Sequence, residues 1–161
     1  MATQDGFHYV KGPCVNVLSK ILSTATFKAR VPVTLTTAGL VCEATGGSDV
    51  TAIYGISMHD AADSIYPQFC MVEVPTPDTV YVAKCATDAS SSELSVGRSV
   101  DIEKSGNYFI IDEDSQATPM VTLVPRDGFD TLDSADSSVH FSWLGDKLGV
   151  FHSNASVNIF T

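Results

Sequence analysis

The amino-acid sequence predicts an all-β protein, a small β-barrel or sandwich of short antiparallel strands with an extended N-terminal arm. Short runs rich in β-branched and aromatic residues alternate between apolar and polar positions, and clusters of Gly, Pro, Asp and Ser separate them at regular intervals. Charged residues make up 17% of the 161 residues and apolar ones 44%, enough to bury one core unaided. We therefore expect a single β domain over residues 31–161 and an arm over residues 1–30.

The arm is predicted because the first thirty residues carry apolar side chains without a clean period. Gly12 and Pro13 interrupt any regular structure that begins near the N-terminus. Beyond them, alternation at Val15 and Val17 indicates a short strand. A segment of this kind often orders against a partner. The alternative is an ordinary edge strand that packs on its own barrel.

The remaining strands follow from alternation and from β-branched and aromatic content. They are expected, in chain order, at residues 32–36, 39–44, 50–56, 68–74, 79–86, 94–102, 108–111, 120–124, 139–143 and 148–152. A Thr-Ala-Gly turn joins the first two. A stiff turn at 75–78 holds two prolines, which fix φ and withhold a hydrogen-bond donor.

The stretch 50–63 is expected to organise the fold. It starts as an alternating strand, is interrupted at Gly55 and Ser57, and continues into an Ala-rich turn at 59–63. We interpret it as a closure element, through which a strand leaves one side of a small barrel and crosses to the other.

Charge is distributed unevenly along the chain. The net charge of −10 argues against nucleic acid as a partner, because phosphates demand a basic face. Residues 1–40 nevertheless hold four basic residues against one acidic residue, whereas residues 41–161 hold five basic and eighteen acidic ones. The basic end suggests a segment that meets an acidic partner surface. A chance grouping of four basic residues is the alternative.

The cysteines and the hydropathy bear on the compartment. The four cysteines show neither a CxxC motif nor metal-ligand spacing, so we expect free thiols and synthesis in a reducing cytosol. No apolar run approaches the length of a signal-peptide core or of a membrane span, and no membrane partner is expected.

Ser57 and His59 are the candidate catalytic residues of the sequence. Residues 55–59 resemble the start of a nucleophile elbow, but His59 stands where the second glycine belongs. An elbow also needs a parallel sheet, which the predicted fold does not offer. We expect no enzymatic activity and no cofactor, with a hydrolase built on these two residues as a rival interpretation.

Four clustered aspartates are the candidate ligands for a metal ion. Asp127, Asp130, Asp133 and Asp136 recur at every third residue, a spacing that fails the pattern of an EF-hand calcium loop. A solvated loop is the expected structure, and an irregular calcium site is the alternative. No metal site is assigned.

Trp143 and Phe141 share one face of a late strand. Aromatic residues dominate buried area in small domains, so we expect both in the core. The sharper alternative is an aromatic platform of a carbohydrate- or host-surface-binding β module of a virion.

The order of motifs resembles that of a known family. A basic and apolar start leads into residues 28–33, a Gly-Leu-Val strand, the strand 53–57, a His-Asp-Ala-Ala turn and a Val-Glu-Val strand. The turn 94–97 and the strands 139–141 and 148–151 follow. This arrangement resembles the decoration, or cement, proteins that coat the capsids of tailed bacteriophages.

The resemblance implies a non-enzymatic virion structural protein with a β-barrel body on the capsid exterior, made in the host bacterial cytoplasm. Its partner would be the major capsid protein, and a homotrimer would be the common oligomer. The arm would bridge neighbouring capsid subunits and stabilise the shell by mass action. The residues expected to contact the capsid are Phe7, Tyr9, Lys11, Val15, Val17, Lys20, Ile21, Lys28 and Arg30.

Overall fold

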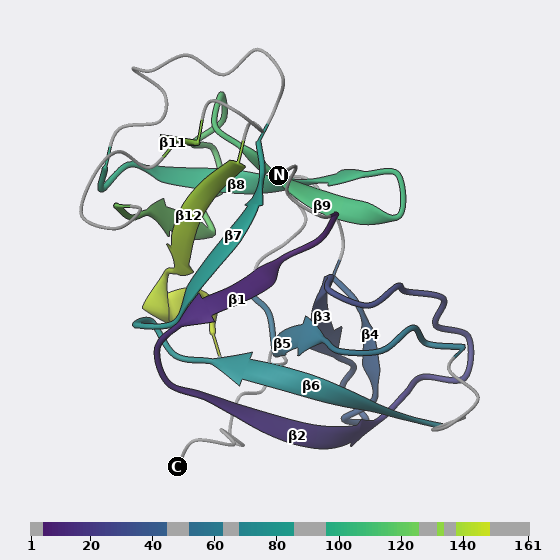
Figure 1. The fold of residues 1–161 in the computed structure, drawn as a ribbon. Helices are drawn as coiled ribbons and strands as arrows, with labels where there is room; N and C mark the ends of the chain where they lie inside the picture. The colour runs from purple at the N-terminus through teal and green to yellow at the C-terminus, as the bar shows by residue number, and fades with distance from the viewer. Residues whose placement is uncertain are drawn as a thin grey trace.

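The computed structural model describes residues 5–44, 52–62, 68–85, 96–125, 132–133 and 138–148, with 132–133 described by the backbone alone. Antiparallel strands make up nearly all regular structure in these ranges, together with one short 3-10 helix, η2 (Gly145–Lys147). The strands form two sheets that pack as a sandwich and do not close into a barrel (Figure 1). The predicted all-β class is confirmed, in its sandwich form.

One sheet has five strands. Their spatial order is β2 (Cys14–Lys20), β6 (Phe69–Pro75), β5 (Gly55–Ser57), β3 (Pro32–Leu35) and β4 (Val41–Glu43). The predicted hairpin of the first two strands after the arm is confirmed as β3 and β4, which pair antiparallel. Its turn works because Gly39 adopts a positive φ of 79°, which a glycine tolerates at no steric cost.

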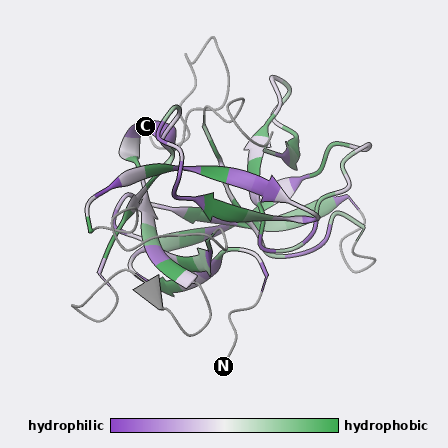
Figure 2. Ribbon diagram, turned by 90° about the horizontal axis from the view of Figure 1, so that it is seen from above, coloured by the Kyte–Doolittle hydropathy of each residue, from purple (hydrophilic) through white to green (hydrophobic). Residues whose placement is uncertain are grey.

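The other sheet has seven strands. Its main path is β1 (His8–Lys11), β7 (Val80–Lys84), β12 (Ser138–Trp143), β10 (Val121–Leu123), β8 (Ser99–Ser105) and β9 (Tyr108–Asp112), and β11 (Leu132–Asp133) pairs with β12 off this path. Figure 2 shows hydrophobic and hydrophilic residues alternating along the strands, as expected for sheets with one face on a core.

An aromatic cluster fills the space between the sheets. The rings of Phe7 and Phe141 meet edge to face at 5.1 Å between centroids, and Trp143 lies 5.7 Å from Phe141. Tyr81 stacks on Phe141 at 6.0 Å. All four side chains are buried. The core position expected for Phe141 and Trp143 is therefore confirmed, and Trp143 is not exposed as a sugar-binding platform would require.

Residues 5–30 of the expected N-terminal arm are instead part of the folded body. β1 is an edge strand of the seven-stranded sheet and β2 an edge strand of the five-stranded sheet, so the chain borders both layers (Figure 1). Gly12, with φ at 99°, makes the passage between them; a Cβ there would lie 2.5 Å from the carbonyl oxygen of Asp78. The alternative of an edge strand packed on its own sheet is the one that the structure bears out, because Phe7 anchors the segment in the core.

The stretch 50–63 does not cross between the sheets. Residues 50–51 and 63 lie outside the described part of the chain, and β5 sits inside one sheet, between β3 and β6. Gly55 is the first residue of this strand and does not interrupt it. A Cβ at this position would lie 2.5 Å from the carbonyl oxygen of Glu73. Glycine is needed for a close approach of two backbones. The sheets are joined instead by the turns 12–13 and 76–79.

Two other expectations shift by a few residues. The strand predicted at 94–102 begins at Ser99, because Val96 and Gly97 form a turn in which Val96 is 54% exposed. Gly97 has a positive φ of 86°, which ends any extended run there. In the strand predicted at 148–152, Leu148 forms a bridge with Ile53, and residues 149–152 lie outside the described ranges.

Candidate interaction surface

The first two strands form a ribbon at the surface of the described part of the chain. We call this segment, residues 8–20, the edge ribbon. It carries large apolar side chains that remain exposed, to 42% for Tyr9, 37% for Val10, 62% for Val15 and 50% for Leu18. Phe69 of the neighbouring strand is 41% exposed as well. Exposed apolar groups gathered on one element are typical of an interaction site rather than of ordinary surface.

The free side of β2 can be defined from hydrogen bonds at its end. The N–H of Ile21 donates to the carbonyl of Gln68 at 2.8 Å, toward β6. The N–H of Leu22 donates at 2.9 Å to the carbonyl of Val41, on the opposite side. Because backbone groups alternate along a strand, the odd-numbered residues of β2 face β6 and the even-numbered ones face outward.

Asn16 and Leu18 therefore present N–H and C=O groups on the side of β2 that faces away from β6. β2 pairs with β6 through an unbroken register from Cys14 to Lys20, and on its other side β4 meets the end of the strand at the parallel bridge between Ile21 and Val41. A regular seven-residue edge without proline or bulge is the kind that sheet proteins usually cover.

The other edges in the described part of the chain are protected. β1 is four residues long and its register shifts between Tyr9 and Lys11, which marks a bulge. β4 has three residues and is bridged at Val41 by Ile21, and β9 is bridged at Ile111 by Cys85. Short, bulged or covered strands resist pairing with another chain. The same bridge between Ile21 and Val41 covers the end of β2, so within the described residues the open part of β2 lies before Lys20.

Two residues expected to contact a capsid lie in the core. Phe7 is fully buried among the aromatic rings, and Ile21 is 8% exposed. Val17 is half-buried and packs against the core. The sequence correctly marked these side chains as apolar, but their partners are other residues of the same chain. The expected contact residues that the structure leaves exposed are Tyr9, Lys11, Val15, Lys20 and Lys28.

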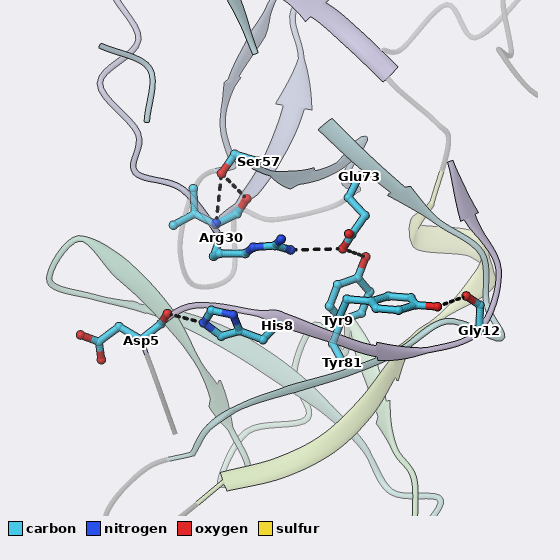
Figure 3. A network of polar contacts seen from close by, with 9 residues as sticks. Asp5, His8, Tyr9, Gly12, Arg30, Ser57, Glu73 and Tyr81 are labelled. Atoms are coloured by element: carbon cyan, nitrogen blue, oxygen red, sulfur yellow. Dashed lines mark hydrogen bonds and ion pairs between the residues drawn. The ribbon is translucent and has the colours of Figure 1, made fainter. Parts of the chain in front are cut away.

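Arg30 is committed to a buried polar network (Figure 3). Its Nη1 lies 3.4 Å from Oε1 of Glu73, and the hydroxyl of Tyr81 donates to the same oxygen at 2.9 Å. Glu73 is 5% exposed. Burial, followed by the negative charge of Glu73, raises the pKa of Tyr81 well above its usual range, so the phenol stays a donor. Arg30 neutralises a carboxylate between the sheets and is not free for a partner.

Lys28 also has an internal partner. Its ammonium lies 3.6 Å from Oδ2 of Asp60, whose Oδ1 accepts a hydrogen bond from the Ala29 N–H at 2.8 Å. Two of the four basic residues that distinguish the N-terminal part of the sequence therefore pair with carboxylates of the acidic body. Lys11 and Lys20 are exposed, and no ion pair joins them to a described residue.

Ser57 is not placed as a nucleophile. It is fully buried, donates to the carbonyl of Lys28 at 2.8 Å and accepts from the Val31 N–H at 3.1 Å. These bonds fix the turn before β3. The rival hydrolase therefore has no accessible hydroxyl at this position.

No metal site is found in the described ranges, where no group of three or more His, Cys, Asp or Glu is arranged to hold an ion. The carboxylates at 127, 130 and 136 lie outside those ranges, and only the backbone of Asp133 is described. Within the same ranges, no helix is long and apolar enough to cross a membrane.

Comparisons with protein-family models, with curated proteins and with solved structures give no match. The resemblance to phage decoration proteins therefore depends on the order of motifs in the sequence.

Sequence reasoning missed Leu18 and Phe69. The signal was present in the run Val15-Asn16-Val17-Leu18, which puts apolar residues on both faces of one short strand. A strand with one face on a core needs only one apolar face. Leu18 lies opposite Met71, and Lys20 lies opposite Phe69, so the extra apolar residues gather on one face of β2 and β6.

Proposed function

We propose that this chain is a non-catalytic decoration protein, which binds the outer surface of a tailed-phage capsid and stabilises it by bridging neighbouring capsid subunits. The class of partner comes from the resemblance of the motif order. The observation that carries the proposal is the edge ribbon, with Tyr9, Val10 and Val15 exposed beside the positive charge of Lys11. An apolar and basic strip on a protein of net charge −10 suits an acidic, partly apolar partner surface.

The folded state of the edge ribbon also lowers the entropic cost of binding. Its strands are already ordered by pairing with β6 and β7, so docking costs little conformational entropy. An arm that folds on contact would lose several kcal/mol to ordering. Burying the exposed apolar side chains contributes roughly 25 cal/mol per Å² removed from water. The acidic remainder of the molecule faces solvent and keeps decorated particles from sticking to one another.

Val10 provides the direct test of the surface. Val10→Asp places a charge in the ribbon at the bulge of β1, where the ladder is already interrupted. Val96→Asp is the matched control, since Val96 is an exposed valine in a turn outside the ribbon. Pelleting with expanded shells of the encoding phage, stripped of their coat, should fall about tenfold or more for Val10→Asp and stay unchanged for Val96→Asp. Equal losses, or none, would remove the ribbon from the interface.

A further inference from the structure

We propose that β2 contacts two neighbouring capsid subunits at once, one on each of its two faces. This division of contacts rests on the proposed function and identifies the residues that meet each subunit. It follows from exposed apolar side chains on opposite faces of one strand, each accompanied by an exposed lysine.

Val15 and Leu18 lie on opposite faces of β2. Successive side chains of a strand point to opposite sides of its sheet, and these two residues are three positions apart. Both are exposed, so the rest of the chain leaves part of each face of β2 uncovered. A partner that docks flat against one face of the sheet leaves the apolar side chain on the other face in water.

The first of the two surfaces lies at the bend between β1 and β2. Its exposed apolar residues are Tyr9, Val10 and Val15, and its cation is Lys11. We call these four residues the bend patch. The Tyr9 hydroxyl donates to the carbonyl of Gly12 at 2.6 Å, which ties the aromatic ring to the bend.

The second surface lies on the other face, across β2 and β6. Leu18 lies opposite Met71 in the register of the two strands. Lys20 lies opposite Phe69, and directly opposed residues share a face. Met58 continues the row beyond β6, since its N–H donates to the Met71 carbonyl at 2.9 Å. We call Leu18, Lys20, Phe69 and Met71 the face patch.

The seven-stranded sheet covers this face of β6 only in part. Glu73, two residues after Met71 on the same face, is buried in contact with Tyr81 of β7. Met71 is half-buried and Phe69 is exposed, so the cover decreases toward the start of β6. The face patch is the part of this face that the other sheet does not reach.

The two patches share one chemistry. Each combines exposed apolar side chains with one lysine, in a protein of net charge −10. Within the described residues, neither Lys11 nor Lys20 has an ion pair. Two surfaces of like composition suit two copies of one acidic, partly apolar partner. A shell supplies such copies side by side, which selects neighbouring capsid subunits as the occupants.

Contact with two subunits gives binding its effect on the shell. A ligand stabilises an assembly only if it binds the assembled state more tightly than the separated subunits. Once one patch is bound, the neighbouring subunit is held close to the other patch at a high effective concentration, which strengthens binding about 100-fold or more. A protein that used one patch alone would bind shells and released subunits equally.

The ratio of two dissociation constants tests this division of contacts. One is measured by pelleting with expanded, coat-free shells of the encoding phage, the other by sedimentation velocity with folded capsid subunits released from those shells. The wild type should bind shells about 100-fold or more tightly than subunits. Leu18→Asp should bring the ratio close to one, because it leaves only the bend patch. Val10→Asp should do the same by leaving only the face patch, and the double variant should not bind.

Val96→Asp is the matched control and should keep the wild-type ratio, since Val96 is exposed in a turn outside both patches. The near-ultraviolet signal of buried Trp143 reports whether each variant is folded, and Phe69→Ser tests the face patch if Leu18→Asp unfolds. A wild-type ratio close to one, or a folded face-patch variant that keeps the wild-type ratio, would overturn the two-face contact. Pelleting of the wild type would then still support binding to the capsid. A wild type that stays in the supernatant would remove the proposed function as well.

Discussion

The hydroxyl of Tyr81 on β7 donates to Oε1 of Glu73 on β6 at 2.9 Å, and this bond joins the two sheets inside the core. Arg30 approaches the same oxygen from the side, 3.4 Å away. A carboxylate that is 5% exposed needs such partners, because an unpaired buried charge is strongly destabilising. The network fixes the position of β6 between the exposed β2 and the core, and so sets the backbone that supports the edge ribbon.

Removal of the Tyr81 hydroxyl should destabilise the fold. Tyr81→Phe leaves the ring in place and takes one partner from Glu73, which should lower the free energy of unfolding by about 1–3 kcal/mol. The matched control is Tyr9→Phe, which loses a bond to the Gly12 carbonyl at an exposed site and should cost less than about 1 kcal/mol. Urea unfolding of the three proteins gives both differences. Equal effects at the two tyrosines would mean that burial of Glu73 does not matter.

The same tyrosine should make stability fall in alkali. Its pKa is raised in the folded protein above the ordinary value of 10.0, so the folded state keeps a proton that the unfolded state loses. The contribution is complete below pH 10 and decreases above it, by about 1.4 kcal/mol per pH unit for one proton. The free energy of unfolding is measured from pH 9 to 11 for the wild type and for Tyr81→Phe. The difference between the two proteins at each pH reports the proton of Tyr81, because the other titrating groups are common to both. A difference that stays flat over that interval would contradict the assignment.

Gly55 should tolerate no side chain. An added Cβ would lie 2.5 Å from the Glu73 carbonyl oxygen and 2.6 Å from a methyl of Val72, so Gly55→Ala must push β5 and β6 apart. We expect a loss of about 2–3 kcal/mol, typical of overpacking. Gly39→Ala provides the comparison, since nothing lies within 4 Å of its Cβ position and only its positive φ is strained. That variant should lose about 1 kcal/mol. Thermal unfolding ranks the two, and the reverse order would be incompatible with the close approach of the strands.

Local patterns in the sequence were sufficient for much of the fold. The hairpin of β3 and β4 was predicted from its glycine turn, and the strand predicted at 68–74 corresponds to β6, Phe69–Pro75. These features depend on residues close in sequence. Strand positions around Val96 were less accurate, because a turn that starts with a valine has the composition of a strand.

Features that depend on pairing between distant residues could not be predicted from the sequence. Whether residues 8–20 form an arm or an edge depends on pairing with β6 and β7, whose partner residues lie 49 to 74 positions further along the chain. The same holds for Arg30, whose role depends on Glu73, 43 residues further on. A basic residue near the N-terminus carries no local sign of a buried partner. The expected contact residues therefore include Phe7 and Ile21, which the structure buries, and do not include Leu18, which it exposes.

The function that we propose for this chain is to bind an assembled capsid from outside and to stabilise it. The most direct measurement adds the wild-type protein to expanded, coat-free shells of the encoding phage and follows both the protein that pellets and the melting temperature of the shells. Saturable pelleting with a rise in melting temperature is expected, because a ligand at about 100 times its dissociation constant stabilises each site by about 2.7 kcal/mol. Protein that stays in the supernatant while the shells melt at an unchanged temperature would rule out the proposed function.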